Sequence, residues 1–293
     1  MKHHFIDLLD RTGDYWSIIP NRERFTFSAD AEITNKNEVK IITVTKFQEE
    51  KYWKQIFECP NIEELTLHSP NKEQVQEIHK LLNIKRLRVS FLRTKDIEFI
   101  GSLQNLEELI LEYVSGFSDL SPLKKLTKLK SVHFENLRRV SNFDTLQGIK
   151  SLKYLSIDGT LDWNQPIENF NFLKELPNIE VFSLGFITNN TDYPALLPIL
   201  HLNKLKKIKI GRATFKTNEY AFLKAAIPNI DGCNWDLCWD YQNNFDFLGK
   251  KAGFVKKSSP IAKQRCDEFI LSFEIMIKEA ENIVQDYKDS LEY

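Results

Sequence analysis

Residues 61–67 read NIEELTL, and related heptads return six times further along the chain. They are NIKRLRV at 83–89, NLEELIL at 105–111, KLKSVHF at 128–134, SLKYLSI at 151–157, NIEVFSL at 178–184 and KLKKIKI at 204–210. Their first apolar residues are separated by steps of 22, 22, 23, 23, 27 and 26 residues. Self-similarity at a period of about 20–29 residues indicates a chain built from stacked repeats.

Each repeat carries two structural signals. Counting from the first apolar residue as offset 0, offsets 3 and 5 are also apolar, as in Leu65 and Leu67, and this alternation predicts a short strand. The segments between heptads have helical spacing, as in Leu120, Leu123 and Leu126, and predict short helices. Polar residues that can cap a first turn precede these segments: Asp96, Asp119, Asn142 and Asn169. A single repeat buries too little apolar surface to fold alone, so the repeats must stack with parallel strands inside the curve.

The stretch from Ser118 to Val132, SDLSPLKKLTKLKSV, resembles leucine-rich repeats of the ~22-residue class found in bacterial internalins and a phosphatase regulatory subunit. The resemblance covers residues ~38 to 235. It implies a right-handed α/β solenoid with parallel strands on the concave face and short helices on the convex face. One departure concerns offset 8, where the family usually has an asparagine that bonds the turn. Here these positions are Pro70, Leu92, Val114, Leu137, Thr160, Ile187 and Ala213, so the turns must satisfy their amides differently.

Three regions follow along the chain. Residues 1–57 are expected to form an N-terminal cap of strands and a helix, because Ile42 and Val44 lie 23 residues before Leu65 and Leu67. Residues 58–235 hold about seven or eight repeats, and residues 236–293 form a C-terminal cap. In this cap we expect an edge strand at 237–241 and a long helix opening at Ser259-Pro260. That helix either covers the end of the stack or binds a second chain.

The composition limits which partners and which cellular location are expected. The net charge of −1 creates no overall field toward nucleic acid or an anionic membrane, so neither is expected as a partner. No stretch reaches the ~20 apolar residues of a membrane span, and the first residues lack the apolar core of a signal peptide. The four cysteines are scattered along the chain, which favours a reduced, cytoplasmic protein.

The sequence contains only weak motifs for metal binding or catalysis. Cys233 and Cys238 lack the second ligand pair of a zinc site, and His3-His4 is a weak pair near a terminus. His133 has no accompanying nucleophile motif, so we interpret it as a surface residue of a binding face. We therefore expect no catalytic residues, no metal and no cofactor.

The candidate binding face consists of offsets 2, 4 and 6, which alternate with the core positions along each strand. An acidic cluster is expected in its middle repeats, formed by Glu108, Glu112, Glu135 and Asp158, with a basic pair, Lys207 and Lys209, further along. Trp163, Phe186 and Tyr193 lie nearby in the longer repeats. The predicted protein-binding residues are Glu64, Arg86, Arg88, Glu108, Glu112, His133, Glu135, Tyr154, Asp158, Trp163, Lys207 and Lys209.

These features predict a non-catalytic protein-binding module. The most specific hypothesis is a cytoplasmic bacterial immunity or antitoxin-like protein that neutralises a partner bearing a basic patch. Two alternatives remain: an adaptor or regulatory scaffold subunit, and an enzyme with a site in residues 235–257. The oligomeric state is left open.

Overall fold

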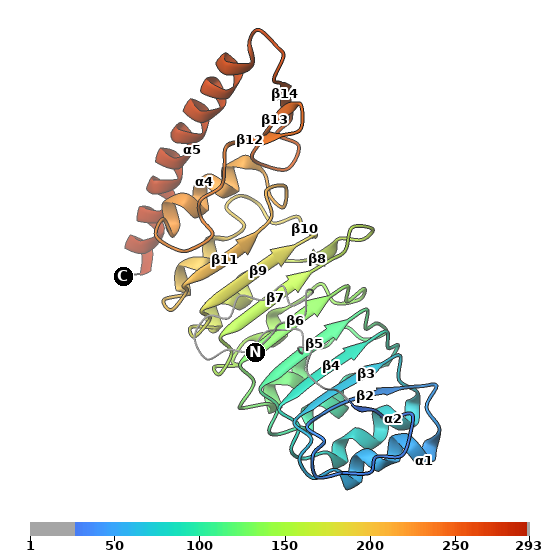
Figure 1. The fold of residues 1–293 in the computed structure, drawn as a ribbon. Helices are drawn as coiled ribbons and strands as arrows, with labels where there is room; N and C mark the ends of the chain where they lie inside the picture. Colours follow the sequence, from blue (N-terminus) through green and yellow to red (C-terminus); the bar gives the residue numbers. More distant parts are fainter. Residues whose placement is uncertain (1–26, 292–293) are drawn as a thin grey trace.

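The computed structural model describes residues 27–291, and within them a nine-stranded parallel sheet forms the main body (Figure 1). Seven of its strands are the predicted ones and begin at the fourth residue of each heptad. In sheet order the strands are β1 (Phe27–Ser28), β2 (Ile41–Thr45), β3 (Glu64–His68), β4 (Arg86–Ser90), β5 (Glu108–Glu112), β6 (Ser131–Glu135), β7 (Tyr154–Asp158), β9 (Val181–Gly185) and β11 (Lys207–Ile210).

The register confirms the stacking predicted from the repeats. Leu65 lies opposite Leu87, and Leu87 lies opposite Leu109. Leu109 lies opposite Val132, which in turn lies opposite Leu155. Equivalent residues of successive repeats are thus direct neighbours across the sheet. The fold is an α/β leucine-rich repeat solenoid.

The opposite side carries the short helices expected from the sequence. Most of its elements are single turns of 3₁₀ helix, because a repeat of about 22 residues leaves too few residues for longer helices. The elements are α1 (Glu50–Trp53), η1 (Lys54–Glu58), α2 (Lys72–Glu77), η2 (Ile78–Lys80), α3 (Glu98–Gly101), η3 (Ser121–Lys125), η4 (Asp144–Leu146), η5 (Asn171–Glu175) and η6 (Leu197–His201). The predicted polar starters do accept first-turn amides: Asp119 Oδ1 lies 2.8 Å from the Ser121 nitrogen.

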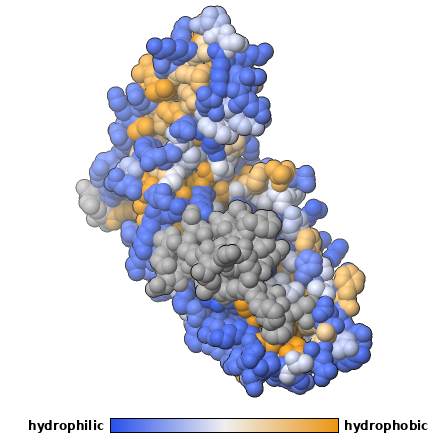
Figure 2. Space-filling model, in the orientation of Figure 1, coloured by the Kyte–Doolittle hydropathy of each residue, from blue (hydrophilic) through white to orange (hydrophobic). Residues whose placement is uncertain are grey.

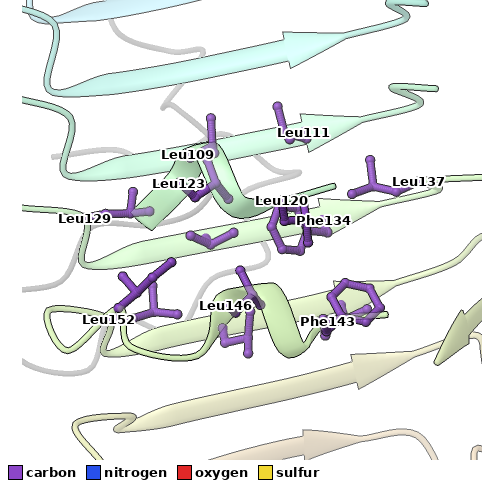
Figure 3. Packing of buried hydrophobic residues seen from close by; sticks show 14 of the residues in the cluster. Leu109, Leu111, Leu120, Leu123, Leu129, Phe134, Leu137, Phe143, Leu146 and Leu152 are labelled. Carbon is purple, nitrogen blue, oxygen red and sulfur yellow. The ribbon is translucent and has the colours of Figure 1, made fainter. Parts of the chain in front are cut away.

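The core lies between the strands and these turns. Figure 3 shows Leu109 and Leu111 of β5 beside Leu120 and Leu123 of the following turn. Both turn residues are completely buried. Further along the stack, Phe134 continues the same core. Burial of such residues in every repeat is the main favourable term for the stack.

Asparagine side chains join successive repeats, although not at the family's usual position. The Nδ2 atom of Asn83 donates to the Pro60 carbonyl at 3.0 Å, that of Asn105 to Leu82 at 2.8 Å, and that of Asn178 to Lys150 at 2.7 Å. These asparagines open the heptads. At offset 8 the side chains other than Thr160 are apolar instead, and Leu92, Val114 and Leu137 are buried.

The longer repeats contain a second, two-stranded parallel sheet formed by β8 (Gln165–Ile167) and β10 (Ile187–Asn189). Gln165 of β8 is fully buried, and its Oε1 accepts the Leu137 backbone N–H at 2.8 Å. Its Nε2 donates to the Val140 carbonyl at 2.6 Å. Gln165 therefore satisfies a turn that has Leu137 instead of an asparagine at offset 8.

At the N-terminal end, β2 pairs with β3 so that Ile42 faces Leu65 and Val44 faces Leu67, as predicted. Trp53 of α1 is buried beneath this end of the sheet. Residues 1–26 of the predicted cap, including His3-His4, lie outside the described residues.

At the C-terminal end, the predicted strand forms the edge of a separate antiparallel sheet rather than of the main one. This sheet contains β12 (Cys238–Tyr241), β13 (Asn244–Phe247) and β14 (Phe254–Lys256). The long helix α5 (Ala262–Leu291) lies along α4 (Thr217–Ala226) (Figure 1). Within 27–291, no helix has the length and apolar character needed to cross a membrane.

Candidate functional site

The face of the sheet opposite the core carries rows of charged side chains. In the first row, Arg86 NH1 lies 2.7 Å from Glu64 Oε1, and Arg86 Nε lies 3.4 Å from Glu108 Oε2. Burial raises the pKa of Glu108 to about 8, and the attraction of Arg86 opposes this rise without cancelling it. Glu108 thus belongs to an alternating Glu–Arg–Glu row.

A second ion pair further divides the predicted acidic cluster. Arg88 binds Glu112 Oε2 through Nε at 2.9 Å and NH2 at 2.7 Å, and both residues are buried. Each of the first two glutamates of the cluster therefore has an arginine partner from β4. Among the described residues, Glu135 and Asp158 are therefore the two members of the acidic cluster without an arginine partner.

His133 lies between these two carboxylates. Its Nε2 is 3.7 Å from Glu135 Oε2 and its Nδ1 is 3.7 Å from Asp158 Oδ2. Burial lowers the pKa of His133, but Glu135, Asp158 and Glu112 raise it more, so the net shift is upward. For Asp158 the effect of burial is to raise the pKa. The attraction of His133 and a hydrogen bond donated by Ser156 Oγ at 2.5 Å lower this pKa, but by less.

The remaining predicted residues lie in different surroundings. Tyr154 is 2% exposed and packs with Ile110 and Val181 as a small apolar cluster on this face. Lys207 forms an ion pair with Asp231 at 2.7 Å, and Lys209 lowers the pKa of Asp158 through its charge. Trp163 does not lie on the strand face.

Trp163 belongs instead to the loop after β7. Its backbone pairs with Thr160, whose N–H donates to the Trp163 carbonyl at 2.7 Å. Its side chain is half-buried in this loop. The structure thus places it at the end of the strands, apart from the charged rows.

An aromatic rim runs along the edge where the strands end, formed by Phe91, Tyr113 and Phe186; sequence reasoning noted Phe186 but missed Phe91 and Tyr113. These residues occupy offset 7 and have φ of 55°, 53° and 47°, in the left-handed region that side chains other than glycine rarely adopt. Their side chains are 53%, 38% and 50% exposed. Separate apolar patches among hydrophilic residues appear at this edge in Figure 2.

The rim is held in place by the sheet itself. The Phe91 N–H donates to the Glu112 carbonyl at 3.0 Å and the Tyr113 N–H to the Glu135 carbonyl at 2.9 Å. The two rings stack with centroids 4.9 Å apart, and His68 meets Phe91 edge-on at 5.3 Å. Aromatic residues at offset 7, in a turn, were the sequence signal for this rim. Ser69 and Asn136, also at offset 7, share this left-handed backbone, so the conformation belongs to the repeat turn and the exposed rings distinguish the rim.

The segment suggested for an enzyme site, residues 235–257, has structural contacts. Trp235 Nε1 donates to the Ile210 carbonyl at 3.2 Å, and its ring meets Tyr220 at 5.0 Å. Lys250 and Lys251 line an open polar hollow of about 430 Å³ beside α4. Trp235 thus contacts β11, the last strand of the main sheet.

Two groups contain possible metal ligands. Burial raises the pKa of Cys233 and of Cys238 to about 12, so both are thiols rather than thiolates at neutral pH. On the strand face, ligand atoms of Glu112, His133 and Glu135 all lie within 4.8 Å of one another. The second group is the stronger candidate.

Comparison with known proteins finds no matching family model and no matching curated protein. Among solved structures, an internalin (inlF) of Listeria monocytogenes is 22% identical, with a TM-score of 0.37, and the match covers 57% of this chain and 53% of that one. Internalin C2 of the same organism is 23% identical, with a TM-score of 0.42, covering 59% and 70%. A leucine-rich repeat protein of Leptospira interrogans is 16% identical, with a TM-score of 0.38, covering 67% and 60%.

Our chain therefore spans about half the length of the first of these structures.

Proposed function

We propose that this chain is a non-catalytic module that binds a protein partner through the charged strand face and the aromatic rim beside it. The observation that carries the proposal is the rim. Phe91, Tyr113 and Phe186 hold exposed rings on left-handed backbone, which costs about 1–2 kcal/mol per residue. Rigid, exposed aromatic side chains are typical anchors of protein interfaces.

Charge on the strand face supports a partner with basic side chains. Arginines pair with Glu108 and Glu112, whereas Glu135 and Asp158 have His133 beside them, and the charge of Lys209 lowers the pKa of Asp158. A lysine or arginine of the partner, reaching this point from the rim, would complete the charge pairing. Such complementarity governs specificity and association rate more than affinity.

Within this function, we propose neutralisation of a bacterial toxin or enzyme, as in immunity proteins, as the specific role to test first. The four free cysteines support a reducing compartment such as the cytoplasm. An adaptor or scaffold role is the alternative. The two roles differ in one measurable property, because an inhibited partner loses activity in the complex whereas a scaffolded partner keeps it.

The test is affinity capture from a native extract with the wild-type chain and two variants. The rim variant is Phe91→Ala with Tyr113→Ala. The matched control is Leu82→Ala, an apolar residue that is 67% exposed and lies just before β4, at the opposite end of the strands. We expect at least one protein to be recovered with wild type and control and lost with the rim variant. Identical recovery with all three would refute the proposal.

A further inference from the structure

His133 is buried among carboxylates without the hydrogen bonds that such burial demands. It is only 9% exposed, and its Nδ1 has no hydrogen-bond partner within the described part of the chain. Both ring nitrogens lie 3.7 Å from a carboxylate oxygen, beyond hydrogen-bond distance. A buried imidazole held between two carboxylates is a candidate ligand for a cation at Nε2, with Nδ1 facing the second carboxylate.

The spacing fits a metal ion. Two ligand atoms that each lie about 2.1 Å from one ion are separated by about 3.4–3.7 Å at tetrahedral to trigonal angles. The distance between His133 Nε2 and Glu135 Oε2 is 3.7 Å. Glu112 supplies a third ligand oxygen, and the three ligand atoms lie within 4.8 Å of one another, so small side-chain rotations would bring them onto one ion.

The surrounding contacts match those that orient metal ligands. Metal-binding histidines usually present their other ring nitrogen to a carboxylate, and Asp158 Oδ2 faces Nδ1 of His133. Asp158 is itself fixed by Ser156 Oγ. Arg88 binds only Oε2 of Glu112, which leaves Oε1 for an ion.

The charge of the group favours a dication. Glu112, Glu135 and Asp158 contribute three negative charges, so even with Arg88 and Lys209 counted against them a negative excess remains while His133 is neutral. One imidazole with two carboxylates suits Zn²⁺ or Mn²⁺, whereas Ca²⁺ and Mg²⁺ prefer oxygen ligands throughout.

We propose that Glu112, His133 and Glu135 form a binding site for a divalent transition-metal ion, with Asp158 as the outer partner of the histidine. The site lies on adjacent strands β5 and β6, so the sheet fixes the spacing of its ligands. This proposal does not depend on the identity of any protein partner.

The test is calorimetric titration of the full, metal-free chain with ZnCl₂ and, in a separate experiment, with MnCl₂. Mn²⁺ is included because it binds oxygen and nitrogen ligands in preference to the thiols of the cysteines. The variants are His133→Ala and Glu135→Gln, and the control is His79→Ala, an exposed histidine of η2. We expect wild type and control to bind one ion at this site, and each ligand variant to lose at least about tenfold in affinity. Asp158→Asn should lose about tenfold through the outer contact.

A second readout locates the ion. In nitrogen-edited spectra of the imidazole groups, the signals absent from His133→Ala should shift on addition of Zn²⁺. Glu135→Gln tests the site even if His133→Ala fails to fold, because the Glu135 side chain is 31% exposed. Wild type without saturable uptake, or ligand variants that bind like the control, would overturn the proposal.

Discussion

Replacing Gln165 by alanine should destabilise the chain strongly, although the residue lies in the short strand β8, outside the main sheet. The change removes the acceptor of the Leu137 N–H and the donor to the Val140 carbonyl, both bonds being buried. A buried polar group without a partner costs about 1–3 kcal/mol, and two such groups give a loss of about 3 kcal/mol. Leu137 also belongs to the apolar core, so no water should replace the amide easily.

Urea unfolding followed by circular dichroism measures this loss. With a denaturant slope of about 3 kcal/mol/M, the midpoint should fall by about 1 M. The matched control is Gln104→Ala, whose Nε2 donates to the Gly101 carbonyl at 2.7 Å from an exposed position, so its effect should stay within about 0.5 kcal/mol. If Gln165→Ala unfolds like this control, the account of the turn is wrong.

Three further predictions concern the core, the rim and pH. Leu109→Ala, at a position 1% exposed between Leu87 and Val132, should cost about 2–5 kcal/mol in urea unfolding; a loss below about 1 kcal/mol would contradict the stacked core. Tyr113→Gly should relieve left-handed backbone while losing the stack on Phe91, so stability should change by less than about 1 kcal/mol. Partner capture by this variant should nevertheless fall at least about tenfold, and undiminished capture would speak against the rim. Because the native pKa of Glu108 is about 8 and its ordinary value 4.5, the native state binds the extra proton, and stability should fall as pH rises from about 5 to 8. Glu108→Gln should reduce this loss of stability but leave the contribution of His133, whose raised pKa acts in the same direction. Stability is measured by unfolding at several pH values. If its dependence on pH is the same in Glu108→Gln as in wild type, the assignment to Glu108 is wrong.

The strand positions were predictable because the heptads recur with little variation. Offsets 3 and 5 must face the core in every repeat, and parallel strands one repeat apart can pair only in the register that aligns them. The pairing of Leu65 with Leu87 and of Leu87 with Leu109 follows directly. The helix type of the segments between the strands was harder to predict, because apolar spacing of three residues fits both a short α-helix and a 3₁₀ turn.

The candidate face was predicted in position but not in its electrostatics. Glu64, Arg86 and Glu108 all occupy offset 2, so their alternating row was readable from the sequence. The prediction instead grouped residues by charge along neighbouring strands, which joined Glu108 to an acidic cluster although Arg86 of β4 pairs with it. By contrast, the role of Gln165 depends on how a long loop returns to the stack, which no local pattern encodes.

The most direct test of the binding surface is hydroxyl-radical footprinting of the chain alone and in complex with a captured partner. We expect the labelling of Phe91 and Tyr113 to fall in the complex, while Leu271 and Ile275, exposed on α5, keep their labelling. Protection of those two α5 residues with full labelling of the rim would contradict this expectation.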